Sequence, residues 1–418
     1  MSEWKKVKLG DCISTKKGFA FKSALYTNCG VPVVRVSDFT LDSVADNDLV
    51  YYPHAEKDRY DEYVLNEGDV LIQTVGSWQY NPNSVVGKVV RVPYYHKGSL
   101  LNQNIVKIIP NNGYNNAFIF YRLKCRDFAG HVLGEARGAA NQASITLDTI
   151  KRFTFDCPLL STQQRIATIL SRYDSLIENY QKQIKLLEEA AQRLYKEWFI
   201  DLRFPGHENR NIVDGVPEGW EKKSVDSIYN IKYGKNLSTK LITETGFYPV
   251  YGANGVIGYY DKANCNEQVV LITSRGNGSG DVLMTYHKDA FITNNSFIVT
   301  PSEGFEYCKL PFTFQFLKMA NFRAVRTGAA QPQLTNQSIH TVDVILPNKN
   351  LIEKFCSATI GMNDTIIKYR EQIRLLTEAR DRLLPKLMSG ELTLEARAEK
   401  EDLLATPCKR GWEEDEAK

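Results

Sequence analysis

Apolar residues recur every three or four positions along a central stretch of the chain that contains neither glycine nor proline. The stretch runs from Ser161 to Phe199 and reads STQQRIATILSRYDSLIENYQKQIKLLEEAAQRLYKEWF. Its alternating steps of four and three form a heptad stripe, which indicates a helix that packs along one partner helix. The stripe consists of Ile166, Leu170, Tyr173, Ile177, Tyr180, Ile184, Leu187, Ala191, Leu194 and Trp198.

A second stretch, at 350–388, repeats this pattern without a gap, 189 residues further on. Each predicted helix has about 38 residues and a length of roughly 57 Å at ~1.5 Å per residue. Ser161 and Asn350 each stand three residues before a glutamine or glutamate and are the predicted N-caps. Thr359 and Arg380 are polar exceptions in the second stripe, whose other members are Phe355, Met362, Ile366, Tyr369, Ile373, Leu376, Leu383 and Leu387.

Two matched heptad helices in one chain are expected to pair with each other. The first helix leads away from the N-terminal segment and the second returns from the segment between them, so we predict an antiparallel pair. A pseudo-twofold axis would pass near the helix midpoints, and Tyr180 and Tyr369 should therefore lie close together. The alternative is two unrelated helices, each packed on its own domain.

The segments outside the helices also form an internal sequence repeat, but their two copies differ far more than the helices do. Gly138-Ala139-Ala140 matches Gly328-Ala329-Ala330 at an offset of 190, and Gly18 matches Gly234 at 216. The runs 70–77 and 270–277 match at 200, whereas NQNIVKIIP and NNSFIVTP match near 191. This contrast suggests that the variable segments determine specificity and that the helices determine the spacing between these segments.

Short apolar runs between turn residues predict strands in both variable segments, and 116–128 and 310–322 predict helices. The expected fold class is α+β: two domains, each with a curved sheet, separated by a pair of long antiparallel coiled-coil helices in a pseudo-twofold internal repeat. The predicted segments are a first domain at 1–157, a central helix at 158–200, a second domain at 201–346, a C-terminal helix at 347–390 and a charged tail at 391–418.

Composition excludes few classes of protein. The 418 residues include 43% hydrophobic and 24% charged residues, with a net charge of +3, which neither supports nor excludes binding to nucleic acid. No apolar run approaches the ~20 residues of a membrane span. The eight cysteines form no CxxC pair, and the N-terminus has no apolar signal segment. We therefore expect a cytoplasmic protein without a structural zinc site.

Motifs for catalysis are missing from the sequence. It contains no GxxxxGK[ST], no HExxH and no histidine spacing suited to a metal. The NPNS at 81–84 differs from the Asn-Pro-Pro-aromatic motif of amino-methyltransferases, and RGNGSGD at 275–281 fits a hairpin loop better than a phosphate-binding loop. We predict no catalytic residue, no metal site and no bound cofactor.

Several loops instead carry side chains that suit the edges of DNA bases. Arginine, asparagine and glutamine can make paired hydrogen bonds to guanine or adenine in the major groove. Each of these residues, taken singly, also fits an ordinary turn or cap. The candidates for base edges are Ser77, Trp78, Gln79, Asn102, Gln103, Asn104, Arg275, Asn277, Asn294 and Asn295. The glycine-alanine segments before each closing strand add the DNA-binding candidates Arg137, Asn141, Arg326 and Gln331. Through Arg137 and Arg326 these segments could position the backbone against phosphate, or they could merely allow tight packing.

The arrangement resembles the DNA-specificity subunits of type I restriction–modification systems. The most specific likeness lies in CPLLSTQQRIATILSRYDSLIENYQKQIKLLEEAAQRLYKEWF and in the preceding GAANQASITLDTIKRFTFDCP, which are similar to the family's central region in residue type and spacing. The second copy departs from this pattern, because LPNKNLIEKF lacks the usual glutamine-rich start.

The resemblance implies a non-catalytic subunit whose two target-recognition domains read a bipartite, asymmetric sequence in double-stranded DNA. It also implies two methyltransferase (modification) subunits around the helices and motor-nuclease (restriction) subunits beyond them. S-adenosylmethionine, Mg and ATP would belong to these partners. The helices would act as a ruler, and roughly 57 Å corresponds to at most about 17 base pairs. Two alternatives remain. The first is a methyltransferase fused to its own DNA-reading domain, but the sequence lacks the cofactor loop and the Asn-Pro-Pro-type motif that this enzyme needs. The second is a coiled-coil scaffold or adaptor without DNA specificity.

Overall fold

The computed structural model describes residues 4–78, 84–139, 142–209, 211–213, 215–328 and 332–392. The chain divides into two compact units, and the division cuts both long helices. Unit 1 comprises the residues up to Ser175 together with those from Leu376 onward, and unit 2 comprises Leu176–Leu375. Each unit thus contains one globular domain and one end of each helix.

The two long helices are α5 (Leu160–Tyr195), which continues into the π-helical turn η5 (Lys196–Ile200), and α9 (Lys349–Met388). Both predicted helices are confirmed, but the predicted caps are wrong. A capping side chain must precede the first helical residue, whereas Ser161 lies inside α5. At the start of α9 the side-chain oxygen of Asn348, and not that of Asn350, accepts a hydrogen bond from the Leu351 N–H at 3.0 Å.

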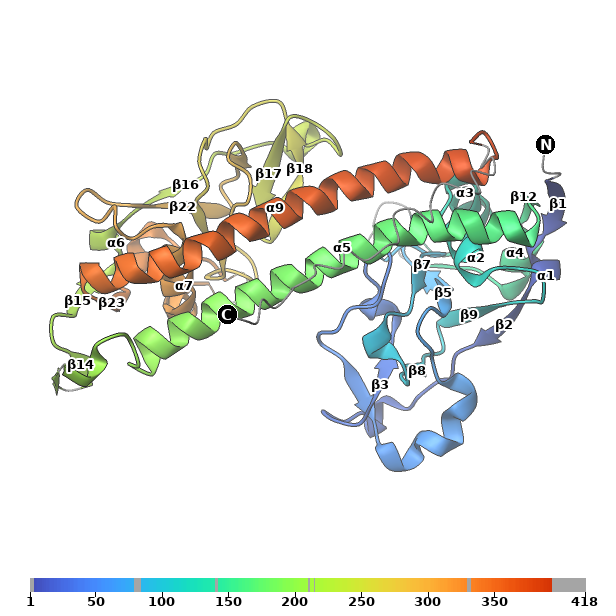
Figure 1. The fold of residues 1–418 in the computed structure, drawn as a ribbon, viewed down its shortest axis with the longest axis horizontal. Helices are drawn as coiled ribbons and strands as arrows, with labels where there is room; N and C mark the ends of the chain where they lie inside the picture. Colours follow the sequence, from blue (N-terminus) through green and yellow to red (C-terminus); the bar gives the residue numbers. More distant parts are fainter. Residues whose placement is uncertain are drawn as a thin grey trace, which may run out of the picture. The chain divides into compact units, whose positions relative to one another are not determined.

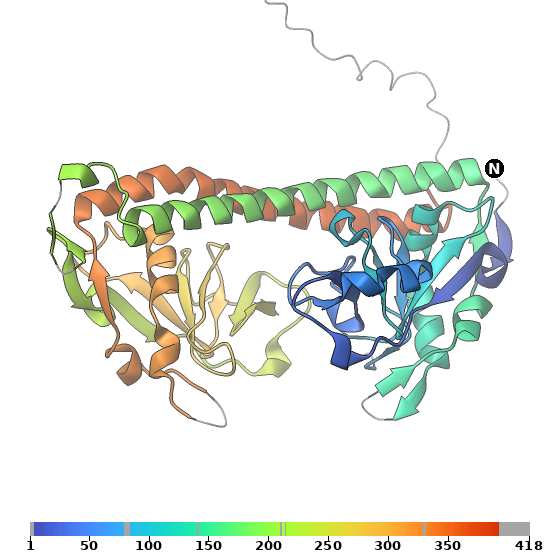
Figure 2. The same cartoon turned by 90° about the horizontal axis from the view of Figure 1, so that it is seen from below.

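Within each unit the two helices run antiparallel (Figures 1 and 2). In unit 2 the rings of Tyr180 and Tyr369 are stacked, and further along α5 the Tyr195 ring lies 5.8 Å from that of Phe355, earlier in α9. Residue numbers therefore rise along one helix while they fall along the other. In unit 1 the early part of α5 meets the late part of α9 through Asp174 and Arg380.

Unit 1 begins as an antiparallel sheet in the order β2-β9-β5-β7 and adds smaller sheets in the orders β4-β3-β8, β10-β11-β6 and β1-β12. Its elements before α5 are β1 (Lys5–Lys8), α1 (Leu9–Cys12), β2 (Ile13–Lys17), η1 (Ser23–Leu25), β3 (Val31–Val34), η2 (Val36–Asp38), β4 (Val50–Tyr52), η3 (His54–Tyr63), β5 (Val70–Gln73), β6 (Val75–Gly76), β7 (Val89–Arg91), η4 (Tyr94–His96), β8 (Leu100–Leu101), β9 (Ile105–Pro110), α2 (Asn116–Leu123), α3 (Arg126–Glu135), β10 (Arg137–Ala139), β11 (Gln142–Ser144), α4 (Leu147–Arg152) and β12 (Thr154–Cys157).

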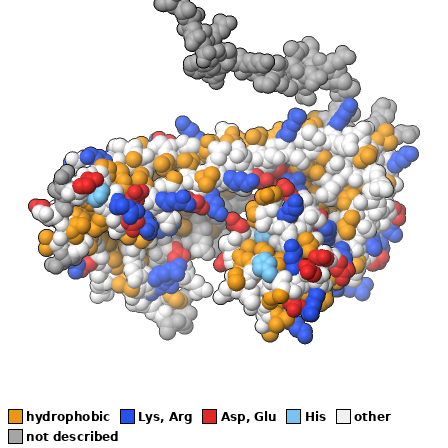
Figure 3. All heavy atoms as spheres, turned by 60° about the horizontal axis from the view of Figure 1, so that its bottom comes forward, with side chains coloured by type: hydrophobic (Ala, Val, Ile, Leu, Met, Phe, Trp, Pro, Cys, Tyr) orange, Lys and Arg blue, Asp and Glu red, His pale blue; other side chains and the backbone are white. Residues whose placement is uncertain are grey.

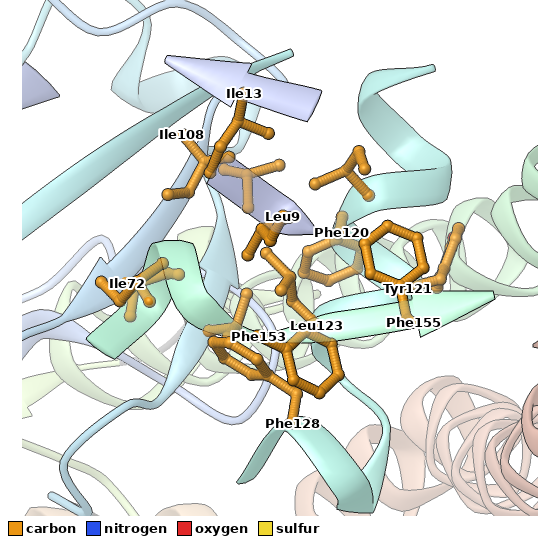
Figure 4. Close-up of a cluster of buried hydrophobic side chains, with 14 of the residues drawn as sticks. Leu9, Ile13, Ile72, Ile108, Phe120, Tyr121, Leu123, Phe128, Phe153 and Phe155 are labelled. Carbon is orange, nitrogen blue, oxygen red and sulfur yellow. The ribbon is translucent and has the colours of Figure 1, made fainter. Parts of the chain in front are cut away.

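The core of unit 1 joins the sheet, the short helices and both long helices. Figure 4 shows part of it, with Leu9 from α1 and Phe120 from α2 packed near Phe153. Leu170 of α5 and Leu387 of α9 belong to the same buried cluster. The helix predicted at 116–128 is partly wrong, because the extended backbone at Cys125 ends one helix and begins another.

Three sheets of unit 2 correspond to sheets of unit 1, in the orders β16-β22-β19-β20, β18-β17-β21 and β15-β23, and the hairpin β13-β14 is a further two-stranded sheet. Unit 2 has a buried core that gathers aromatic rings of both long helices. Its elements are η6 (His207–Asn209), β13 (Ile212–Val213), β14 (Val216–Pro217), β15 (Glu221–Ser224), α6 (Val225–Ile228), β16 (Tyr229–Tyr233), η7 (Thr239–Leu241), β17 (Tyr248–Gly252), β18 (Gly255–Tyr260), β19 (Val270–Thr273), β20 (Val282–Met284), β21 (Phe291–Ile292), β22 (Ser296–Pro301), α7 (Leu310–Met319), η8 (Phe322–Val325), α8 (Asn336–Ile339) and β23 (Asp343–Leu346).

The two units share a pattern of backbone hydrogen bonds at the residue offsets read from the sequence. In both units the same sheet edge, turn and closing segment are joined by equivalent bonds, so the internal repeat is a repeat of structure. The pairs, with the N–H donor first and unit 1 before unit 2, are Gly18–Ile105 and Gly234–Ser296 (both 3.0 Å), Thr74–Asn104 and Ser274–Asn295 (2.9 and 2.8 Å), and Ile145–Thr74 and Leu334–Ser274 (2.9 and 2.7 Å).

The repeated glycines lie where the chain has no room for a side chain. A Cβ at Gly18 would stand 1.9 Å from the Asn102 carbonyl oxygen, and one at Gly234 would stand 2.3 Å from the Thr293 oxygen. Both contacts are with backbone atoms of a tight turn. Glycine is therefore required here for close approach.

We expect Gly18→Ala to lower the free energy of unfolding by about 1–3 kcal/mol, since the facing turn must move to accommodate the methyl group. Gly234→Ala should have a similar effect in unit 2. Gly130→Ala is the control, because a Cβ there meets no atom within 4 Å and the residue lies in α3. This substitution should stabilise the protein by about 0.5–1 kcal/mol. Urea unfolding curves measure all three; equal effects of the three substitutions would contradict the steric argument.

Candidate nucleic-acid interface

In unit 1 the structure brings three of the predicted DNA-contacting residues together. Ser77 and Trp78 follow β6, which pairs with β11, and Arg137 begins the neighbouring strand β10. The Trp78 indole N–H donates to the Ala139 carbonyl oxygen at 2.9 Å, which ties the loop to the hairpin. Ser77 is buried and its hydroxyl lies 2.8 Å from that of Ser84, whereas Arg137 is exposed. The candidates Gln79 and Asn141 lie outside the described residues.

Unit 2 forms the equivalent cluster from the glycine-containing loop 275–281 and the segment around Arg326. Arg275 forms a β-bridge with Gln333, which also bridges Thr327. The Arg326 guanidinium approaches the Asn277 carbonyl oxygen at 3.4 Å, and its Nε is buried without a hydrogen-bond partner among the described residues. The loop joins the antiparallel strands β19 and β20, which confirms that it is a hairpin loop. Gln331 lies outside the described residues.

The predicted asparagines at 102–104 and 294–295 occupy tight turns next to these clusters. The Asn104 carbonyl accepts hydrogen bonds from both the N–H and the hydroxyl of Thr74 at 2.9 Å, and the Asn102 amide donates to the Tyr26 hydroxyl at 3.3 Å. In unit 2, the Asn294 and Asn295 carbonyls accept from the Ser274 hydroxyl and N–H. Asn104, Asn294 and Asn295 thus hold the loops in place through their backbone carbonyls, and Asn102 through its side chain. Gln103 is exposed at the turn.

Charged side chains of both signs surround the loop clusters, and only some of the arginines are paired with a carboxylate. On the face shown in Figure 3, lysine and arginine side chains are interspersed with carboxylates, consistent with the net charge of +3. In unit 2, Asp281 pairs with Arg323, whose Nε lies 3.1 Å from the carboxylate oxygen. Arg275 and Arg326 form no ion pair with any carboxylate in the part of the chain that the structure describes. Both can therefore bind an acceptor outside the chain.

The helix pair supplies the second candidate site. The rings of Tyr180 and Tyr369 lie 4.8 Å apart with an interplanar angle of 27°, which confirms the predicted proximity. Arg370 of α9 pairs with Glu188 of α5 at 3.0 Å and stacks 3.7 Å above the ring of Tyr286. This contact joins both helices to the domain of unit 2.

All predicted members of the helix-pair core are buried or half-buried in the structure. They are Ile166, Leu170, Tyr173, Ile177, Tyr180, Ile184, Leu187 and Leu194 on α5, and Phe355, Met362, Ile366, Tyr369, Ile373, Leu376 and Leu383 on α9. Thr359, one of the polar exceptions, is also buried, and its hydroxyl donates to the Phe355 carbonyl oxygen at 2.8 Å.

Arg380, the charged exception in the stripe, lies in a buried ionic network of unit 1. It contacts Asp174 of α5 at 2.8 Å and Asp42 of the domain at 2.9 Å, and Asp42 also pairs with Lys124. The Tyr121 hydroxyl donates to Asp174. The side chains of Asp174 and Arg380 are only 9% and 11% exposed. Sequence reasoning missed these partners, although a charge inside an apolar stripe is itself a signal that a buried counter-ion is needed.

Mutual neutralisation keeps this network ionised. Burial disfavours the charged form of Asp42, but Lys124 and Arg380 outweigh it and hold the pKa of Asp42 below its usual range. Burial also opposes the charge of Arg380, whereas Asp42 and Asp174 raise the pKa of Arg380. Burial, followed by the charge of Asp174, raises the pKa of Tyr121, so its hydroxyl stays protonated and remains a donor.

The described residues contain neither an arrangement of metal ligands nor a helix that could span a membrane. Among the residues whose placement the structure gives, no group of three or more His, Cys, Asp or Glu side chains is arranged to hold a metal ion. Within the same ranges, none of the helices combines the length and the apolar character that crossing a bilayer requires.

The geometry defines a class of protein: a chain with two repeated α+β domains, each carrying a loop cluster, joined through a long pair of antiparallel helices. The family model described as the type I restriction modification DNA specificity domain matches residues 1–189 and 217–369. The chain belongs to this family.

Individual relatives agree with this assignment. The chain is 28% identical to the type I restriction enzyme MjaIX specificity subunit of Methanocaldococcus jannaschii, over 70% of this chain and 73% of that protein. It is 21% identical to the HindI specificity subunit of Haemophilus influenzae, over 94% of this chain and all of that protein. The solved structure of the type I S subunit from M. genitalium has the same fold, with a TM-score of 0.53, 18% identity, and coverage of 93% of this chain and 96% of that one.

Proposed function

We propose that this chain is the DNA-sequence-specificity subunit of a type I restriction–modification complex. Residues 1–157 and 201–346 are its target-recognition domains, and residues 158–200 and 347–390 are the helices that connect them. It has no catalytic activity of its own. Membership of the specificity-domain family supports this proposal, together with a repeat that keeps the scaffold while changing the exposed loops.

The observation that carries the proposal is the pair of unlike loop clusters on equivalent hydrogen-bonded scaffolds. Two residues after the end of β5, unit 1 has Val75 in β6, whereas two residues after the equivalent strand β19, unit 2 has the exposed Arg275. Two identical domains related by a pseudo-twofold axis would read a palindrome, and two unlike domains read an asymmetric target. The target is therefore bipartite, with two different half-sites and an unspecified spacer.

The partners follow from the reaction that the complex performs on DNA. Two methyltransferase subunits dock on the helix pair, and motor-nuclease subunits join the assembly. Methylation of a base within a duplex requires that the base be flipped out of the stack. The chain holds both methyltransferase subunits in register with their target bases, and S-adenosylmethionine, Mg and ATP bind to the partners.

Methylome sequencing tests the proposal directly. A host without other methyltransferases, expressing this chain with its methyltransferase partners, should show one methylated motif with two unlike half-sites. The scaffold alternative predicts a complex of the same subunits without a methylated motif. Failure of the complex to bind any duplex at low salt would contradict the proposed function.

A further inference from the structure

The backbone of Arg275 is fixed on both sides. The preceding residue, Ser274, is fully buried; its N–H donates to the Asn295 carbonyl at 2.8 Å and its own carbonyl accepts from the Leu334 N–H at 2.7 Å. Arg275 then bridges Gln333, and the Gly276 N–H donates to the Pro332 oxygen at 3.0 Å. The side chain of Arg275 thus projects from a rigid point, as a specific contact requires.

The chain beside Arg275 leaves room for a ligand to approach. Gly276 has a φ of +83°, in the left-handed region that favours glycine, and a Cβ at this position would meet no atom within 4 Å. The space next to Gly276, the residue that follows Arg275, is therefore open. Arg275 itself is exposed.

The one carboxylate in the loop 275–281, that of Asp281, already has a partner. Asp281 accepts hydrogen bonds from the guanidinium of Arg323, with Nη2 at 2.5 Å and Nε at 3.1 Å. Among the described residues, no hydrogen bond or ion pair engages the Arg275 side chain. The N–H donors of an arginine guanidinium lie in one plane in a fixed arrangement. Without a partner among the described residues, the donors of Arg275 are available to an acceptor on a ligand.

We propose that Arg275 reads a guanine through the major groove in the half-site bound by unit 2. This inference rests on the proposed function. A guanidinium fork matches the O6 and N7 acceptors of guanine, which is the commonest specific contact between a side chain and a base. Because the matched residue in unit 1 is Val75, this guanine contact has no counterpart in the other half-site.

The test compares the methylated motif of the wild-type complex with the motifs of Arg275→Ala and Arg275→Lys complexes. Both variants should lose the requirement for a guanine at one position of one half-site, while all other positions stay specified. Discrimination at that position should fall by about 5- to 150-fold. Lysine keeps the charge but not the planar fork, so its failure to restore discrimination would support paired hydrogen bonding over charge alone.

Arg323→Lys is the matched control, because Arg323 borders the same loop but is engaged by Asp281. This variant should leave the motif and its methylation level unchanged. An unchanged motif in the Arg275 variants would overturn the inference while leaving the proposed function intact. Uniformly weaker methylation without relaxed specificity would also overturn it, since that is the behaviour of a phosphate contact. A wild-type complex without any methylated motif would overturn the proposed function itself.

Discussion

Replacing Asp174 by alanine should lower the free energy of unfolding of unit 1 by about 3–5 kcal/mol. The substitution leaves the Arg380 guanidinium buried with two carboxylates, those of Asp42 and Asp381. The Asp381 side chain is 56% exposed, so it compensates little of the buried charge. It also removes the charged acceptor of the Tyr121 hydroxyl, which keeps, among the described residues, only the Ser171 hydroxyl at 3.3 Å. Hydrogen–deuterium exchange by mass spectrometry resolves the effect by unit, and faster exchange should appear in peptides of unit 1.

Glu188→Ala is the matched control for this prediction. The ion pair of Glu188 with Arg370 also joins α5 to α9, but the two side chains are 43% and 39% exposed, so its loss should cost no more than about 1 kcal/mol. The double variant Asp174→Leu with Arg380→Leu should recover much of the lost stability, since apolar residues can replace a buried ion pair. Equal losses for Asp174→Ala and Glu188→Ala would contradict the buried network.

Inserting one heptad into both long helices should lengthen the unspecified spacer of the DNA target and leave both half-sites unchanged. The insertions belong between Ser175 and Leu176 in α5 and between Leu375 and Leu376 in α9, where the two compact units meet in sequence. A heptad adds ~10.5 Å of helix, which corresponds to at most about three base pairs. It also nearly preserves the phase of the apolar stripe.

The methylated motif again provides the measurement. An insertion of five residues is the control, because it rotates the stripe out of phase and should abolish methylation rather than lengthen the spacer. Changed half-sites after the heptad insertion would place recognition outside the two domains. An unchanged spacer would mean that the helices do not determine the distance.

The long-period features of the molecule could be predicted because they repeat along the sequence. The heptad stripe predicted that both long helices exist, and its symmetry predicted the contact of Tyr180 with Tyr369. The match of Gly18 with Gly234 reappears as the same backbone contact in both units. Periodicity and repetition are properties of the chain itself, so a single sequence contains them.

Contacts between distant, unrelated positions could not be predicted in the same way. Arg380 was visible only as an exception in the stripe, and nothing along the chain connects it with Asp42, which lies in a loop of the domain. The roles of the asparagines also depend on the fold, because Asn104 and Asn295 act through carbonyl groups that every residue type possesses. Asn348 and Asn350 are both residue types that can cap a helix, so the sequence does not decide between them. The local backbone geometry selects Asn348.

The discontinuous make-up of unit 1 has a consequence for how the protein is made. Unit 2 is one continuous stretch of chain, whereas the core of unit 1 includes Leu387 and Met388, which are synthesised almost last among the described residues. A growing chain that has just passed Leu375 therefore holds all of unit 2 but an unfinished unit 1. Domains generally fold as they emerge from the ribosome. Unit 1 begins to leave the ribosome first but is completed last. Its core keeps apolar surface exposed until the end of α9, with Leu387 and Met388, has been synthesised.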